Sequence, residues 1–262
     1  MNSKPDNILS VHNYCDRWCE RCRFVDRCAV GSSEKLLAAE LEMDLAMTEE
    51  KRNEIMWNHV ADSFAEAGRL LEKMIAEAGL DIEEIKRDAK ENPYVAPKLT
   101  KHQEATKELT KNYGMAVHDW IKNKPALFEP EALMSRVLVQ PEDPDKFMAK
   151  TKDAIETVNW FGFFISVKSQ RAISGKQEDD YEEAEDMLQS DFNGSAKIAL
   201  IAVGRSIEAW EFLLKAFPEM EADIIGYLAQ LQKISRYLLI EFPDAQKFIR
   251  PGFDEAKYDD IQ

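Results

Sequence analysis

The fold class is decided by residues 144–165, which read PDKFMAKTKDAIETVNWFGFFI. Pro144 suits the first turn of a helix, because it lacks a backbone N–H and its φ is already helical, and Asp143 can cap that turn. Apolar side chains and one threonine then recur every three or four residues, which marks one face of an α-helix. They are Phe147, Thr151, Ala154, Val158, Phe161 and Ile165. Because residues 160–165 are apolar on all sides, we predict that this helix lies centrally in the core.

The same periodicity extends in both directions from this helix. It predicts further helices over residues 34–47, 48–78, 98–124, 131–139 and 218–242, a helix that starts within the acidic stretch 178–191 and continues to 214, and a short helix after Asp81. One helical face is especially regular, and its members are Met56, Val60, Phe64, Ala67, Leu71 and Met74. Ser33, Thr48 and Asp81 are predicted N-caps, because their side-chain oxygens can accept from free N–H groups of a first turn. Residues 31–33 and 174–180 are predicted breaks between helices.

No run of four or more residues alternates between apolar and polar side chains with turn signals on both sides, so no β-strand is predicted. We therefore predict an all-α fold, an antiparallel helical bundle of about five long helices. An N-terminal four-cysteine metal-binding module is expected to precede it. The predicted division is a cysteine module at 1–33, the bundle at 34–250 and an acidic tail at 251–262.

The charge of the chain is distributed unevenly. The 262 residues carry 34 Lys and Arg against 49 Asp and Glu, a formal net charge of -15. Residues 1–31 hold five bases and four acids, net +1, so the remaining residues carry -16. A negative surface argues against nucleic acid as a partner, because phosphate binding needs a positive field. The expected partner is a protein, with the acidic stretch 178–191 as one candidate docking surface.

Membrane and export signals are absent from the sequence. The longest apolar runs, 160–165 and 198–204, fall far short of the about 20 residues that span a bilayer. The first residues lack the apolar stretch of a signal peptide. We expect a cytoplasmic protein with no membrane partner, and in that reducing setting grouped cysteines more often bind metal than form disulfides.

All four cysteines of the chain fall within fourteen residues, as Cys15, Cys19, Cys22 and Cys28. On a helix the first three would share one face, and the chain must turn after the third to bring in the fourth. Four thiolates suit either a tetrahedral zinc ion or a [4Fe–4S] cluster. Either filled site is anionic, and four arginines interleave with the cysteines as possible donors to sulfur: Arg17, Arg21, Arg23 and Arg27.

The spacing C-x2-C-x5-C from Cys19 to Cys28 resembles the iron–sulfur staple of RecB-type nucleases and the SPASM domains of radical SAM enzymes. The order C-x3-C-x2-C from Cys15 to Cys22 is also similar to the radical SAM cluster loop. Both resemblances imply an iron–sulfur cluster, although the chain offers neither a nuclease core nor the alternating βα pattern of a barrel. A zinc knuckle also places four ligands in so short a span, so both metals stay open, with the cluster slightly favoured.

Two enzyme hypotheses compete with simple metal binding, and in both the cysteine site is only structural. A ferritin-like di-metal oxidase needs Glu-x-x-His motifs, and the residues three before His59, His102 and His118 are not glutamates. Glu208-x-x-Glu211 and His59-x-x-Asp62 are present, but such pairs are common on solvated helix surfaces. The pair Arg52 and His59 is similar to the R-x4–6-H motif of HEPN ribonucleases, in which histidine would transfer a proton and arginine would hold phosphate. A third hypothesis is an acidic protein–protein interaction module.

Overall fold

The computed structural model describes residues 6–42, 48–93, 95, 97–123, 143–179 and 187–256. Every regular element within these ranges is helical, which confirms the all-α prediction. The chain divides into two compact units. One unit comprises Met1–Lys98 together with Pro251–Gln262, and the other comprises Leu99–Arg250. The predicted helix at 131–139 and half of the acidic stretch 178–191, residues 180–186, lie outside the described residues.

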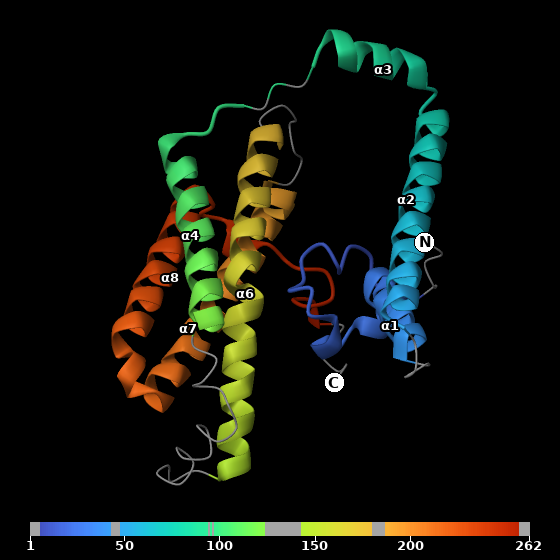
Figure 1. Ribbon diagram of the computed structural model, residues 1–262. Coiled ribbons are helices and arrows are strands. Elements are labelled where there is room, and N and C mark those ends of the chain that lie inside the picture. The colour runs from blue at the N-terminus through green and yellow to red at the C-terminus, as the bar shows by residue number, and fades with distance from the viewer. Residues whose placement is uncertain are drawn as a thin grey trace. The chain divides into compact units, whose positions relative to one another are not determined.

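The described residues of the second unit form four long helices. They are α4 (Lys101–Asn123), α6 (Pro144–Asp179), α7 (Asp191–Ala216) and α8 (Glu221–Glu241). Helices α4 and α7 each contact both α6 and α8, so the four close into a bundle. Successive helices run in opposite directions along it (Figure 1). The predicted break at 174–180 is wrong in its position, because α6 continues to Asp179.

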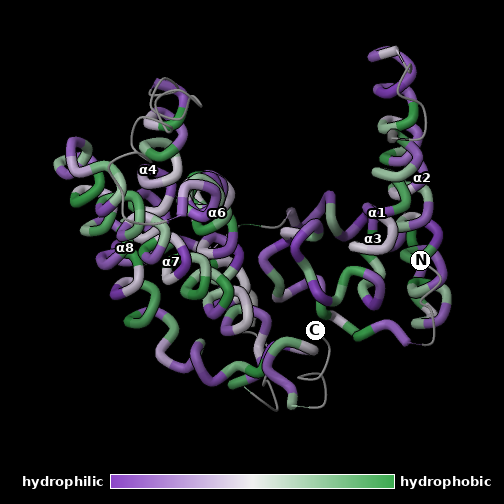
Figure 2. The backbone as a smooth tube through the Cα atoms, turned by 90° about the horizontal axis from the view of Figure 1, so that it is seen from below, coloured by the Kyte–Doolittle hydropathy of each residue, from purple (hydrophilic) through white to green (hydrophobic). Residues whose placement is uncertain are grey.

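The bundle core follows the predicted face of α6. All six side chains of that face, from Phe147 to Ile165, are buried. The apolar stretch 160–165 is not buried on all sides, because Trp160 and Phe163 remain 37% and 47% exposed. Apolar and polar residues alternate along the bundle helices (Figure 2), so each helix turns one stripe inward.

Two features fix how closely the bundle helices approach. A Cβ placed on Gly114 of α4 would lie 2.8 Å from the carbonyl oxygen of Gly162 on α6, so only glycine permits this contact. Across the core, the Trp210 indole N–H donates to the Tyr113 hydroxyl over 3.0 Å. Both rings are fully buried, and this hydrogen bond satisfies a donor that has lost its water.

The first unit contains three α-helices: α1 (Ala29–Glu42), α2 (Glu49–Glu77) and α3 (Ile82–Glu91). The predicted caps of α2 and α3 are confirmed, since Thr48 accepts from the Lys51 N–H and Asp81 from the Glu83 N–H. The predicted break at 31–33 is wrong, because α1 runs through it. The Gly31 N–H donates to the Cys28 sulfur, so Cys28 caps this helix and Ser33 does not.

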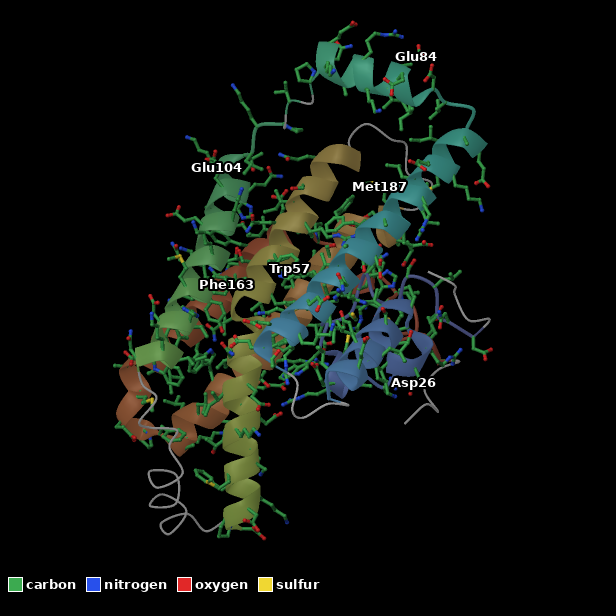
Figure 3. The ribbon with its side chains drawn as sticks, turned by 45° about the vertical axis from the view of Figure 1, so that its right-hand side comes forward. Asp26, Trp57, Glu84, Glu104, Phe163 and Met187 are labelled. Atoms are coloured by element: carbon green, nitrogen blue, oxygen red, sulfur yellow. The ribbon has the colours of Figure 1, made fainter. Side chains whose placement is uncertain are left out.

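Helix α2 differs from the bundle helices because it buries none of its 29 residues. Its large apolar side chains are exposed to solvent, with Trp57 66% and Phe64 75% exposed. Trp57 is labelled on this helix in Figure 3. The periodic face predicted from the sequence is therefore present on a helix, but nothing in the described residues covers it. None of the helices in these ranges combines the length and apolar content required to cross a bilayer.

Candidate metal centre

The four cysteines lie in a loop that the structure folds back on itself. Two single turns of 3-10 helix interrupt it, Cys19–Arg21 and Val25–Arg27. The shared helical face of the first three cysteines is therefore not formed, while the predicted turn between Cys22 and Cys28 is present. All four cysteines are free thiols, and all four line one small cavity.

Backbone amides point at three of the four sulfur atoms. The Arg17 N–H donates to Cys15 over 3.4 Å, the Phe24 N–H to Cys22 over 3.4 Å, and the Gly31 N–H to Cys28 over 3.3 Å. Arg17 reaches this position with a φ of 59°, which is strained for a residue with a side chain. Amides aimed at sulfur stabilise negative charge there, and such bonds tune metal–thiolate sites.

Cys19 is held differently from the other three. Among the described residues no peptide N–H is directed at its sulfur, and its thiol is instead hydrogen-bonded to Glu34 of α1. It is also partly exposed, whereas Cys15 and Cys28 are buried. Cys19 borders a second hollow of about 330 Å³, which is open toward Glu20, Glu34 and Lys35. Cys22 is partly exposed as well, but of the four cysteines Cys19 alone borders this hollow.

A small apolar core supports the cysteine loop. Ile8, Val11, Phe24 and Cys28 are buried together, and Cys22, Val30 and Phe253 pack against them. Phe253 comes from the predicted acidic tail, and its ring meets Phe24 edge-on with centroids 5.0 Å apart. Residues from both ends of the chain thus build the walls around the sulfur atoms.

The four interleaved arginines make contacts around the loop. Arg17 lies 3.7 Å from a Glu34 carboxylate oxygen, and Arg27 donates to the Asp6 carbonyl over 3.0 Å. Arg21 and Arg23 stack over the rings of Trp18 and Phe24. Guanidinium groups so placed bring positive charge near the site and shield its aromatic walls.

The environment of the loop disfavours free thiolates. The pKa of the Cys19 thiol is raised to about 12, chiefly by burial and then by the hydrogen bond and negative charge of Glu34, while the positive charge of Arg17 opposes this rise. Burial also raises the pKa of Cys22. A nucleophilic cysteine needs the opposite environment, because the thiolate is the reactive form. These two cysteines are therefore poor nucleophiles as they stand.

The structure does not support a preformed metal site. Within the described residues, no three His, Cys, Asp or Glu side chains are gathered as the ligands of one ion would be. The cavity between the cysteines is about 10 Å³, close to the volume of a single water. To bind one metal ion, the cysteine side chains of the loop would have to rotate until their sulfur atoms surround it.

The competing enzyme sites are not assembled by the fold. Arg52 and His59 both lie on α2, but Arg52 does not line the open hollow beside His59, whose other polar lining residues are Ser33, Asp62, Ser63, Glu66 and Arg69. Two carboxylates beside the histidine disfavour a phosphate ligand. Glu208 and Glu211 are both exposed on α7, as expected of a solvated pair.

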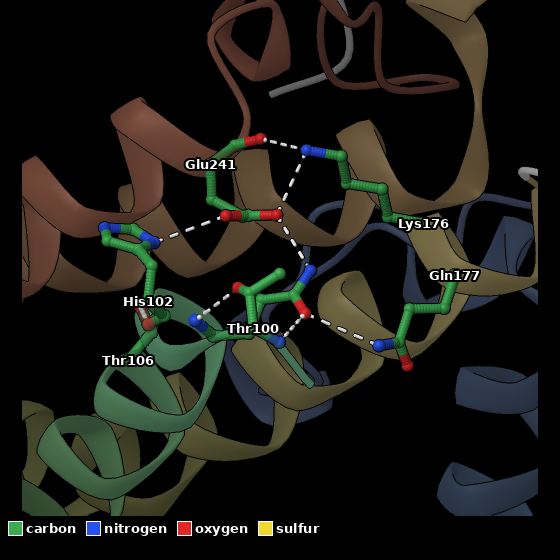
Figure 4. Close-up of polar contacts among 7 residues, drawn as sticks. Thr100, His102, Thr106, Lys176, Gln177 and Glu241 are labelled. Carbon is green, nitrogen blue, oxygen red and sulfur yellow. Dashed lines mark hydrogen bonds and ion pairs between the residues drawn. The ribbon is translucent and has the colours of Figure 1, made fainter. Parts of the chain in front are cut away.

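One polar cluster in the bundle was not predicted from the sequence (Figure 4). Glu241 of α8 accepts from Gln103 of α4 over 2.9 Å and from Lys176 of α6 over 3.0 Å. The His102 ring lies 3.3 Å from its other oxygen. Burial alone would raise the pKa of Glu241, but these hydrogen bonds and the Lys176 charge outweigh it and lower the pKa. The cluster ties three helices together, and helical periodicity could not reveal it because its members come from distant segments.

No protein-family model matches the chain, and comparison with curated proteins and with solved structures found no similar protein.

Proposed function

We propose that this protein is a cytoplasmic metal-binding protein in which Cys15, Cys19, Cys22 and Cys28 hold a [4Fe–4S] cluster or a zinc ion. The observation that carries the proposal is the convergence of all four cysteines on one cavity, with peptide N–H groups aimed at three sulfurs. Reduced thiols grouped so closely in a reducing compartment are typical of a metal site. The raised thiol pKa values fit this function, because a bound cation supplies the charge that thiolates need.

The two metals are favoured by different observations. The spacing from Cys19 to Cys28 resembles iron–sulfur staples, and amide donors to sulfur are a means of tuning cluster potentials. The cavity volume of about 10 Å³ instead suits a single ion, since zinc and its four sulfurs need little interior space. The loop between Cys15 and Cys28 has no α-helix, which leaves it free to adjust to either occupant.

The metal is expected to organise the N-terminal unit. Cys28 caps α1, and both Cys22 and Phe253 of the C-terminal segment pack against the small apolar core that contains Cys28. A group bound to all four sulfurs would therefore join the loop, α1 and the chain's last residues into one module. With iron the same site can also exchange an electron or sense oxidants, whereas zinc limits it to a structural role.

The test is the metal content and absorption spectrum of the full chain purified without oxygen. The matched control is a chain with all four cysteines replaced by serine, compared by circular dichroism to check its helices. About four irons with a broad visible absorption support the cluster, and one zinc without colour supports the structural site. A metal-free wild-type protein with full helicity would overturn the proposal.

A further inference from the structure

Helix α2 carries an apolar seam that the described residues of its own unit leave exposed at every member except Val60, which is half-buried. Starting at Trp57, the apolar positions follow at alternating steps of three and four residues, which is the a/d pattern of a coiled coil. The six members are Trp57, Val60, Phe64, Ala67, Leu71 and Met74. The pattern spans about three heptads of a helix about 43 Å long.

The residues flanking the seam are also free of charge. The e and g positions between residues 56 and 75 hold only apolar or small side chains, namely Met56, Ala61, Ser63, Gly68, Leu70 and Ile75. The charges of this stretch all fall on the opposite side of the helix: Asp62, Glu66, Arg69, Glu72 and Lys73. Such a broad uncharged face is typical of a helix that packs against another helix.

The exposed area of this face is large enough for a stable interface. Trp57, Phe64 and Met74 are 66%, 75% and 65% exposed. Leu70, Leu71 and Met56 are 47%, 57% and 43% exposed. At about 200 Å² for a large apolar side chain, the exposed parts amount to roughly 700 Å² per copy. A standard protein interface buries about 800 Å² per partner, and patches of several hundred Å² mark interaction sites.

We propose that α2 pairs with α2 of a second copy of this chain, antiparallel across a two-fold axis that passes between Ala65 and Glu66. In this register Phe64 lies opposite the partner's Ala67, Val60 opposite the partner's Leu71, and Trp57 opposite the partner's Met74. Each of the two central layers then contains one large and one small side chain, Phe64 of one copy and Ala67 of the other, so the two layers have the same volume. A parallel pair would instead face like with like, with two phenylalanines in one layer and two alanines in the next.

The pairing is isologous, so the same patch serves both copies and each substitution acts twice. The test is the molar mass of the full chain by sedimentation velocity over a range of concentrations. Wild-type protein is expected to be a dimer, and Phe64→Glu is expected to raise its dissociation constant at least about a hundredfold. The matched control is Ala65→Glu, which adds the same charge one residue away on the solvated side and should leave the dimer intact.

A second pair of variants tests the register and does not depend on a buried charge. Ala67→Phe alone places two phenylalanine rings in the central layer and should weaken the dimer. Phe64→Ala combined with Ala67→Phe restores one large and one small side chain per layer and should recover it. A monomeric wild-type chain, in which an apolar surface elsewhere in the same chain covers α2, would overturn the proposal. So would a dimer that Phe64→Glu leaves unchanged. The metal content of the protein, which tests the proposed function, does not depend on whether α2 forms this dimer.

Discussion

Replacement of Gly114 by alanine tests the packing of the bundle most directly. The added Cβ would lie 2.8 Å from the Gly162 carbonyl oxygen and 2.9 Å from a Phe163 ring carbon. The oxygen belongs to the backbone of α6, so α4 and α6 must separate to relieve the contact. Overpacking of this kind costs about 1–3 kcal/mol. Alanine also favours a helix over glycine by about 1 kcal/mol, which partly offsets that cost.

A matched glycine in the same bundle separates the two effects. A Cβ on Gly204 of α7 meets nothing within 4 Å, so Gly204→Ala gains the helix preference without the clash. We expect the free energies of unfolding of the two variants to differ by about 1–3 kcal/mol, with Gly114→Ala the less stable. Urea unfolding followed by circular dichroism measures this difference. Equal stability of the two variants would refute the close approach of α4 and α6.

Two further predictions concern the polar groups. If the cysteines bind metal, Cys19→Ser should retain more metal per chain than Cys28→Ser. The reason is that Cys28 also caps α1, while Cys19 is partly exposed and lacks an amide donor. Equal losses of metal in the two variants would contradict this order. Glu241→Gln should lower the free energy of unfolding at neutral pH by about 1–3 kcal/mol, because Lys176 loses its charged partner. Because folding lowers the pKa of Glu241, the ionised carboxylate stabilises the fold fully at pH values above the ordinary pKa of a glutamate. This stabilisation is lost as the pH falls through the pKa that Glu241 has in the folded protein. The deficit of the glutamine variant should therefore shrink as the pH falls below the ordinary pKa of a glutamate, and a deficit independent of pH would argue against an ionised Glu241.

The sequence predicts most of the helices because their signals are local. Thr48 and Asp81 cap α2 and α3 as expected, since a cap depends only on a side chain and the next three residues. The start of α1 was missed because its cap is a sulfur. Cys28 accepts the Gly31 N–H that a serine or aspartate oxygen usually takes, and sequence rules for caps do not include cysteine. Gly114 shows a second limit, because only the position of Gly162 on another helix explains why it is glycine.

In the candidate site too, the features that depend on neighbouring residues could be predicted from the sequence, whereas those that depend on distant residues could not. The spacing of the four cysteines suggests a shared site, and the structure gathers them around one cavity. The contribution of Phe253 could not be predicted, because it lies more than 220 residues further along the chain than Phe24. Likewise, the periodicity of α2 specifies which face is apolar but carries no information on what covers it. A periodic apolar face predicts burial only when the chain also supplies a complementary surface, and α2 buries none of its residues in this structure. In the proposed two-fold pair of α2 helices, the complementary surface is the same face of a second copy, because Phe64 of each copy lies opposite the smaller Ala67 of the other.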